Sequence, residues 1–425
     1  MSPYPRTLGV VAALALGAGT LVSAPAAQAA DLDRAPATTL AGAATQLADP
    51  VGVTRDRFGR LYVANRDTHK ILVFAANATG NAAPVRVISG AATLLATPDD
   101  IEVDAAGYIY VANHDADRIT VYPPTPGTGA PNEAPVRTIT APANQLDGVA
   151  AIEVDAHGGI YAASWSAHTV AYFDSTASGT VAPDRLIAGD KTKLYRPWSL
   201  LLRADGSLVV GTENEAVLQF ATSDTGNVAP DRVLGGLVSD LGIVSGLGED
   251  ARGNLYTSSY TDSTIKVFAK GAVGNATPTV VLKGSHTGLN MPWGIHVDAA
   301  GRVTAAQYAG NSVRTYAPLV ATPAAPVVTR PSKVRALKVS GKQTAAKRRI
   351  SWKAPASTGG ARITAYRVVV RKGGKTLVAK TVSGSRRSLV VKRSKLRNGK
   401  VTVSIRARNA KGYGPTVKKI FRVKK

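Results

Sequence analysis

The feature that most restricts the fold of this chain is a short phrase that occurs six times. Its turn glycine recurs at intervals of 48, 51, 48, 47 and 48 residues, at Gly59, Gly107, Gly158, Gly206, Gly253 and Gly301. A fixed period of this size indicates an array of supersecondary units. Because each unit buries its faces only against its neighbours, the whole region must fold as one array.

The pattern inside each period predicts four strands. Apolar residues alternate before the glycine, as at Ile101 and Val103, and again after it, as at Ile109 and Val111. A third strand ends on an aromatic residue, and a fourth runs from a proline to a small residue six positions later. An aspartate three residues before most of the glycines, as at Asp104, favours a tight turn. Four antiparallel strands in roughly 48 residues make one propeller blade.

The last period lacks its fourth strand, and the N-terminal segment from Pro36 to Gly42 has the matching spacing. We therefore expect this segment to close a six-bladed β-propeller over residues 31–318. Residues 56–65 and 104–113 resemble the NHL repeat of six-bladed propellers. The resemblance implies the fold but no single function, because that superfamily includes scaffolds, ligand-binding proteins, lactonases and lyases.

The first 30 residues have the pattern of a secretory signal peptide. Arg6 precedes an uncharged, mostly apolar run over residues 8–22, and the small residues of 27–29 suit cleavage. The run is short of the roughly 20 residues of a membrane-spanning helix, and no second apolar span follows. The sequence predicts a secreted protein without a transmembrane span, extracellular or associated with the cell envelope.

One end of the propeller is the expected place for a site. The innermost strand of each blade begins, and the second strand ends, at the end opposite the turn glycines. The residues there differ from blade to blade, as in a scaffold that carries a binding site. The candidate ligand-binding residues are Asn65, Asp99, Asn113, His114, Trp165, Trp198, Glu213, Tyr260, Trp293 and Tyr308. Aromatic rings beside a polar pore suit stacking on a carbohydrate, although they equally suit packing that plugs the pore.

An enzyme is the alternative. The gluconolactonase type of six-bladed propeller is similar to this fold, and the similarity implies a central divalent metal held by Glu, Asn and Asp. Asn65, Asp99, Asn113 and Glu213 would be the candidate ligands near the axis here. The chain departs from that family at residues 48–50 and 98–100, where the family has Glu-Gly-Pro and Pro-Asn-Gly. We therefore expect no catalytic residue, no metal and no other cofactor, and a hydrogen-bonded polar plug at the axis.

A change of composition marks the C-terminal part. Residues 319–332 are rich in proline and predict a semi-rigid linker. Residues 333–425 show short alternating strands, and a set of their residues resembles a fibronectin type III domain, an all-β sandwich. The residues of that resemblance are Trp352, Pro355, Tyr366, Leu396, Ala407, Arg408, Asn409, Gly412, Gly414 and Pro415. Val401 stands where that family usually has a tyrosine.

The charge of this chain is concentrated in the C-terminal part. Residues 331–425 hold 29 of the 52 Lys and Arg residues and none of the 28 Asp and Glu residues, so the rest has a net charge of −5. A field of this strength attracts polyanions, and a purely solubilising surface rarely lacks carboxylates altogether. The candidate polyanion-binding residues are Lys347, Arg348, Arg349, Arg386, Arg387, Lys392, Arg393, Lys395 and Arg397.

Together these patterns predict an exported, non-catalytic, monomeric binding protein. The sandwich would retain it on an anionic polysaccharide or cell-wall polymer, since export removes intracellular nucleic acid as a partner. The propeller face would bind a ligand such as a carbohydrate, or a protein. Two alternatives remain open. One is a propeller enzyme, namely a gluconolactonase-like lactone hydrolase, a lyase or a polysaccharide-acting hydrolase, with the sandwich as an accessory carbohydrate-attachment module. The other is a scaffold for protein–protein interaction.

Overall fold

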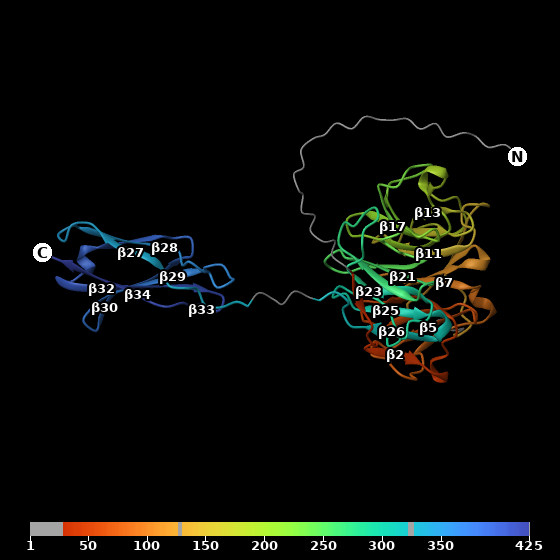
Figure 1. Ribbon diagram of the computed structural model, residues 1–425, viewed down its shortest axis with the longest axis horizontal. Helices are drawn as coiled ribbons and strands as arrows, with labels where there is room; N and C mark the ends of the chain where they lie inside the picture. The colour runs from red at the N-terminus through yellow and green to blue at the C-terminus, as the bar shows by residue number, and fades with distance from the viewer. Residues whose placement is uncertain (1–28, 126–129, 322–326, 425) are drawn as a thin grey trace, which may run out of the picture. The chain divides into compact units, whose positions relative to one another are not determined.

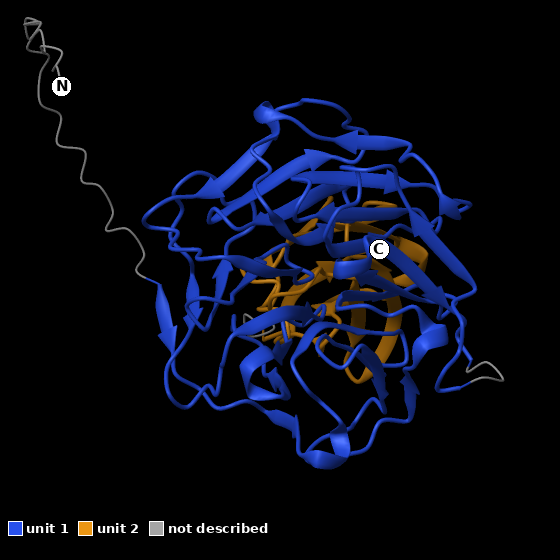
Figure 2. Ribbon diagram, turned by 90° about the vertical axis from the view of Figure 1, so that its right-hand side faces the viewer, with its two compact units in different colours: residues 1–321 blue, residues 322–425 orange. Residues whose placement is uncertain are grey.

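The computed structural model describes residues 29–125, 130–321 and 327–424. The chain divides after Ala321 into two compact units, shown in Figure 1 by residue number and in Figure 2 in separate colours. The predicted signal peptide lies outside the described residues, apart from its last two positions. No helix in the described part of the chain is both long and apolar enough to pass through a membrane.

The first unit is the predicted six-bladed propeller. Each innermost strand contacts the innermost strands of both neighbouring blades, and the last contacts the first, so the ring is closed. The strands of the first three blades are β3 (Pro50–Arg55), β4 (Leu61–Asn65), β5 (Lys70–Phe74), β6 (Arg86–Ile88); β7 (Pro98–Val103), β8 (Ile109–Asn113), β9 (Arg118–Tyr122), β10 (Arg137–Thr140); β11 (Val149–Val154), β12 (Ile160–Ser164), β13 (Thr169–Phe173) and β15 (Arg185–Ile187). Those of the last three are β16 (Pro197–Leu202), β17 (Ser207–Thr212), β18 (Ala216–Ala221), β19 (Arg232–Gly235); β20 (Val244–Glu249), β21 (Leu255–Ser259), β22 (Thr264–Phe268), β23 (Val280–Leu282); β24 (Pro292–Val297), β25 (Val303–Gln307), β26 (Ser312–Tyr316) and β2 (Thr38–Ala41).

The N-terminal strand completes the sixth blade, as the sequence predicts. β2 pairs antiparallel with β26, and Leu40 lies opposite Val313 in the register. The turns between the first two strands of the blades also follow the prediction. Asp56 accepts hydrogen bonds at Oδ1 from the backbone N–H groups of Phe58 and Arg60, each at 2.9 Å. The repeated aspartates therefore hold turns.

Neighbouring blades are also joined by contacts that the sequence pattern did not predict. Two short strands, β1 (Ala30–Leu32) and β14 (Gly179–Thr180), pair parallel with the outer strands of other blades, β23 and β10. Isolated parallel bridges, such as the one between Leu40 and Gly80, join other neighbouring blades, and a side chain next to most of these contacts caps a turn in the preceding blade. Asn81 accepts a hydrogen bond at Oδ1 from the backbone N–H of Ala44 at 2.8 Å. The residues in the corresponding positions are Asn132, Asn227, Asn275 and Asp33.

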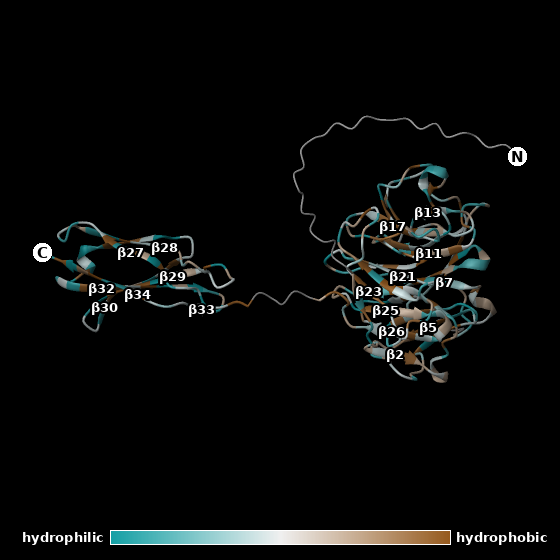
Figure 3. Cartoon of the chain, viewed as in Figure 1, coloured by the Kyte–Doolittle hydropathy of each residue, from teal (hydrophilic) through white to brown (hydrophobic). Residues whose placement is uncertain are grey.

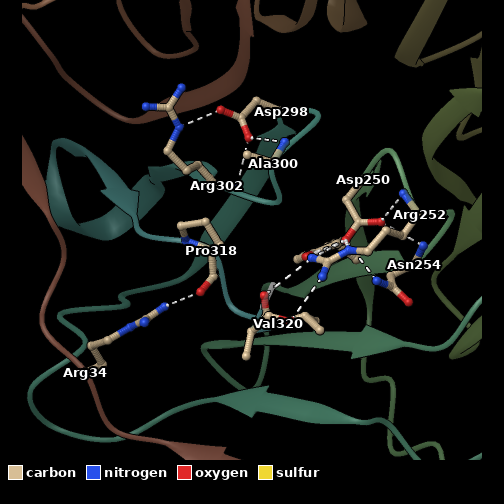
Figure 4. Close-up of polar contacts among 11 residues, drawn as sticks. Arg34, Asp250, Arg252, Asn254, Asp298, Ala300, Arg302, Pro318 and Val320 are labelled. Carbon is tan, nitrogen blue, oxygen red and sulfur yellow. Dashed lines mark hydrogen bonds and ion pairs between the residues drawn. The ribbon is translucent and has the colours of Figure 1, made fainter. Parts of the chain in front are cut away.

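The end of the propeller is held against its beginning (Figure 4). Arg34 donates from Nη2 to the carbonyl oxygens of Ala317 and Pro318. Arg252, which also pairs with the buried carboxylate of Asp250, donates to the carbonyl oxygens of Val320 and Ala321. The segment that leaves the sixth blade is therefore fixed to the propeller as far as the boundary between the two units.

The second unit is a sandwich of two sheets around its own core. One sheet contains β27 (Arg335–Ser340), β28 (Lys347–Lys353) and β31 (Ser388–Lys392). The other contains β30 (Lys375–Ser383), β29 (Ala365–Lys372), β32 (Gly399–Asn409), β33 (Gly412–Tyr413) and β34 (Val417–Val423). Short 3-10 turns in the two units are η1 (Ala43–Thr45), η2 (Ala91–Thr93), η3 (His114–Ala116), η4 (Asp190–Thr192), η5 (Tyr308–Gly310) and η6 (Arg393–Lys395).

Along the strands of the sandwich, buried apolar residues of the core alternate with exposed charged residues. Tyr366, Val368 and Val370 of β29 are buried, whereas Arg367 and Arg371 between and beyond them are exposed. Figure 3 shows this alternation as hydrophobic and hydrophilic residues following one another along the strands. Because one face of each sheet supplies the core, the cations are placed on the two outer faces.

Candidate functional site

The residues predicted to line one end of the pore come together there. Pro197 at the start of β16 lies opposite Thr212 at the end of β17, and the other blades repeat this pairing. The register shifts between Pro197 and Ser199, so Trp198 is an extra, unpaired residue. Bulges of this kind redirect a side chain away from the regular face of a strand. This local irregularity places Trp198 at the pore.

Five aromatic side chains form a continuous group at this end, which we call the aromatic cluster. Its members are Trp165, Trp198, Tyr260, Trp293 and Tyr308. The ring centroids of Trp198 and Trp293 are 4.7 Å apart, and those of Trp293 and Tyr308 are 5.3 Å apart. His114 extends the group, with its ring centroid 6.0 Å from that of Trp165. All members except Trp293 keep part of their side chain exposed.

Glu213 fixes the orientation of two of these rings. Its Oε2 accepts hydrogen bonds from the indole Nε1 atoms of Trp165 at 3.0 Å and Trp198 at 3.1 Å. Its Oε1 accepts from Arg196 at 2.9 Å, and the Arg196 guanidinium also lies over the Trp165 ring at 4.3 Å. Burial raises the pKa of Glu213, but the hydrogen bonds from the indoles and Arg196 outweigh it and hold the pKa below its usual value. Glu213 is thus an ionised anchor for the rings.

A second pairing of an arginine with an acidic side chain lies on the opposite side of the cluster. Arg66 approaches Asp99, with 3.3 Å between Nε and Oδ1, and its guanidinium lies over the Trp293 ring at 5.2 Å. Asp99 is only 4% exposed. Burial raises the pKa of Asp99 to about 8, although the positive charge of Arg66 lowers it. The two arginines therefore flank the aromatic cluster and were not among the predicted residues.

Four of the predicted ligand-binding residues are buried, and the prediction that they contact a ligand is corrected. Asn65 and Asn113 are fully buried, and their amides bond the chain itself: the Oδ1 atoms accept from the backbone N–H groups of Ala48 and Ala96. Trp293 is 5% exposed and packs inside the aromatic cluster, and Asp99 is buried beside Arg66. These side chains support the face from beneath, and we leave them out of the surface that a ligand would touch.

Acidic side chains line the pore below the aromatic cluster. Asp100, Glu102 and Glu153 surround a channel of about 50 Å³, beneath Trp198 and Trp293. Burial raises the pKa of Asp100 to about 7 and raises those of Glu102 and Glu153 as well. A volume of this size holds a few water molecules at roughly 10–15 Å³ each, and no sugar or lactone ring.

The described donors do not converge on a metal site. Within residues 29–125, 130–321 and 327–424, no three His, Asp or Glu side chains are close enough together to hold a metal ion. Asn113 accepts a hydrogen bond from the backbone N–H of Ala96, Asp99 faces Arg66, and Glu213 accepts from the two indoles and Arg196. The ligand set implied by the gluconolactonase resemblance is therefore not assembled.

The C-terminal unit places its cations on the surface, with one exception. Lys347 and Arg349 are exposed on β28, and Lys392 lies directly opposite Lys347 on β31. Arg386, Arg387, Lys395 and Arg397 are exposed, and Arg393 is half-buried. The prediction that Arg348 would contact a polyanion is wrong, because its side chain is buried. It is 5% exposed, lies over the Phe421 ring at 5.1 Å and donates to the carbonyl oxygens of Lys342 and Arg422.

Comparison with known proteins agrees with this organisation. Residues 332–423 match the model of the fibronectin type III domain. The C-terminal unit is a fibronectin type III domain. We call it the FnIII domain below. Val401, where the family usually has a tyrosine, is buried and pairs with Phe421 in the register of β32 and β34. No curated protein matches the chain by sequence.

Solved structures with a similar arrangement are β-propellers. The WD40 β-propeller domain of Doa1 is 13% identical over 63% of this chain and 78% of its own, with a TM-score of 0.45. A streptogramin B lyase is 13% identical over 65% of this chain and 84% of its own, with a TM-score of 0.43. A catalytically inactive virginiamycin B lyase from Staphylococcus aureus with quinupristin is 12% identical over 74% of this chain and 94% of its own, with a TM-score of 0.46. No function follows from likenesses of this size.

Several residues that shape the site were missed by the sequence reasoning. Glu102 and Glu153 both stand five residues before a turn glycine, so their common depth in the pore was readable from the repeat. Arg196 precedes Trp198 by two residues, and Arg66 directly follows Asn65 at the end of its strand. No local pattern indicates that these arginines turn back over indole rings.

Proposed function

We propose that this is an exported binding protein whose FnIII domain retains it on an anionic polymer outside the cell. The observation that carries the proposal is the composition of this domain, which contains 29 Lys and Arg residues and no Asp or Glu. The propeller, in contrast, pairs many of its cations internally, as Arg60 does with Asp56 and Arg203 with Glu249. An uncompensated field of this kind attracts polyanions.

The distribution of the cations supports a large polymeric partner. They cover both outer faces, with Lys347 and Arg349 on β28 and Arg367 and Arg371 on β29. A small anion needs one site, whereas a polymer gains from charge spread over a surface. The predicted signal peptide favours an acidic polysaccharide or cell-wall polymer over nucleic acid.

Salt-dependent retention tests the proposal. We expect the full chain to bind a column of cell-wall polymer or acidic polysaccharide at low ionic strength and to elute as salt is raised. A chain that ends at Ala321 is the control, because β2 completes the sixth blade without the FnIII domain. Retention of this shortened chain with the same strength and salt dependence as the full chain, or binding of the full chain that does not change with salt, would contradict the proposal.

The aromatic cluster supports a second role, the binding of a carbohydrate by the propeller face. Trp165, Trp198 and Tyr260 are part-exposed, and Glu213 holds the two indoles in place without a ligand. Preformed aromatic rings suit stacking on sugars. The channel of about 50 Å³ beneath the cluster has no room for a sugar ring, so a bound carbohydrate would lie on the exposed rings.

A glycan array compares the two tryptophans that lie at the pore. Trp198→Ala should abolish a specific glycan signal, whereas Phe at the same position should retain most of it. Trp293→Ala serves as the control for packing, because that ring is buried. If no glycan binds and Trp198→Ala instead removes binding of an exported protein, the scaffold alternative holds and the carbohydrate proposal fails.

A further inference from the structure

A trough crosses the outer face of the larger FnIII sheet. Ala379, Val369 and Ser404 stand directly opposite one another on β30, β29 and β32, so small side chains form a row across three strands. Lys418 lies opposite Ser404 on β34 and ends the row. These residues and their neighbours line a hollow of about 350 Å³, which is in the size range of ligand pockets. We call this hollow the trough.

Arginines stand on both banks of the trough. Arg367 lies directly opposite Arg406 on one bank, and Arg371 stands on the other. Arg367 and Arg371 are four residues apart on one strand, which separates the banks by about 13 Å. None of these residues belongs to the cationic clusters that the sequence pattern indicated. A row of small side chains between two charged rows leaves room for one polymer chain.

Two of the arginines are held in place before any ligand arrives. The Arg406 guanidinium lies over the ring of Tyr413, 4.2 Å from its centroid. Arg371 donates from Nε to Oγ1 of Thr376 at 3.2 Å. Both contacts leave terminal N–H donors for an anion, and the domain contains no Asp or Glu side chain that would compete. A fixed guanidinium loses less conformational freedom when it binds an oxyanion in a bidentate manner.

We propose that the trough binds a segment of a linear anionic polysaccharide, with sugar rings on the small-residue floor and their carboxylate or sulfate groups on the arginines of the banks. This inference rests on the proposed function and assigns it a specific site. The lining residues include no aromatic ring on which a nucleic-acid base could stack. A concave trough also fits a single chain better than a flat bilayer surface.

The test uses the full chain and two matched pairs of substitutions. Arg367→Gln with Arg371→Gln removes two exposed charges from the banks. Lys347→Gln with Arg349→Gln removes two exposed charges from the outer face of the other sheet. Binding of a heparin-derived hexasaccharide and of a hyaluronan hexasaccharide is measured by titration calorimetry at physiological ionic strength. We expect the Kd to rise about tenfold or more for the bank variant and less than about threefold for the matched variant.

A third variant separates shape from charge. Ala379→Phe fills the floor without changing the charge, and it should weaken binding as strongly as the bank variant. If both charge variants weaken binding equally and Ala379→Phe has no effect, the trough is overturned while general polyanion retention stands. If the unaltered chain binds neither the hexasaccharides nor the polymer column, the proposed function itself fails. Loss of binding to single-stranded DNA or anionic vesicles in the bank variant, with hexasaccharide binding unchanged, would also overturn the trough proposal.

Discussion

Arg34 and Ala317, separated by 283 positions in the sequence, are joined by a hydrogen bond of 2.6 Å from the guanidinium Nη2 to the carbonyl oxygen. Arg34 lies between the two strands that the N-terminal segment adds, β1 on the fifth blade and β2 on the sixth. The bond therefore ties the start of the ring to the segment that leaves it (Figure 4).

The first prediction concerns this junction. Arg34→Ala should lower the free energy of unfolding of the propeller by about 1–2 kcal/mol, because two carbonyl oxygens lose a charged donor. Hydrogen exchange of peptides that cover residues 317–321 should become faster, whereas peptides of the third blade should be unaffected. Lys191→Ala, an exposed change elsewhere on the ring, is the control. Unchanged exchange at 317–321 would show that the bond contributes nothing.

A second prediction concerns the acidic channel. Burial raises the pKa of Glu102 above its value in the unfolded chain, so the folded protein favours the protonated form. Protonated Glu102 therefore makes its full contribution to the free energy of unfolding below the pKa of the unfolded chain, near 4. This contribution is lost as pH rises from there through the pKa of the folded protein. Glu102→Gln keeps an acceptor for the Thr54 hydroxyl and removes the titration.

The variant should therefore gain stability over the natural chain by about 2 kcal/mol or more between pH 5 and pH 8, since one pKa unit corresponds to about 1.4 kcal/mol. Denaturant unfolding at the two pH values measures the difference. Asp231→Asn, a change at an exposed site, is the control, and it should change the free energy of unfolding by the same amount at pH 5 and at pH 8. A gain that is equal at pH 5 and pH 8 would contradict the raised pKa.

A third prediction concerns the anchor of the aromatic cluster. Glu213→Ala leaves two indole N–H donors and Arg196 without their acceptor, and we expect a loss of about 1–3 kcal/mol in the free energy of unfolding. Tryptophan emission should change because the rings of Trp165 and Trp198 lose their fixed orientation. Glu213→Gln keeps one acceptor, so its stability and its emission should lie between those of the alanine variant and the natural chain. Identical emission spectra for the alanine variant and the natural chain would argue against the anchoring role.

The fourth prediction separates two adjacent arginines of the FnIII domain. Arg348→Ala should destabilise the domain by about 2 kcal/mol, because it removes a buried cation that packs over Phe421 and donates to the carbonyl oxygens of Lys342 and Arg422. Arg349→Ala should change the stability by less than about 0.5 kcal/mol. Binding to the polymer column at a temperature where both variants are folded should show the reverse order.

The repeat predicted most of the propeller because its signal is carried by local spacing. The turn aspartates, the alternating strands and the closing strand after Pro36 all follow from residues that are close in the sequence. The site depended on contacts between blades, which local spacing does not contain. Trp198 and Trp293 occupy corresponding positions in their blades, yet only Trp198 remains part-exposed. The difference arises from the rings that surround each of them.

The same limit explains the error at Arg348. Lys347, Arg348 and Arg349 read as one basic cluster in the sequence, but alternate residues of a strand point to opposite faces. Arg348 turns inward toward Phe421, which is more than 70 positions away. The trough was missed for a related reason. Its arginines are scattered over β29 and β32 and become neighbours only through the register of the two strands.

The composition of the FnIII domain has a consequence for how the proposed attachment would be controlled. Residues 331–425 contain no Asp, Glu or His, so the domain lacks the residue types that ordinarily act as switches between pH 5 and pH 8. Under the proposed function, release from a polymer would be triggered by competing ions, by loss of charge on the polymer itself, or by cutting of the chain between the two units.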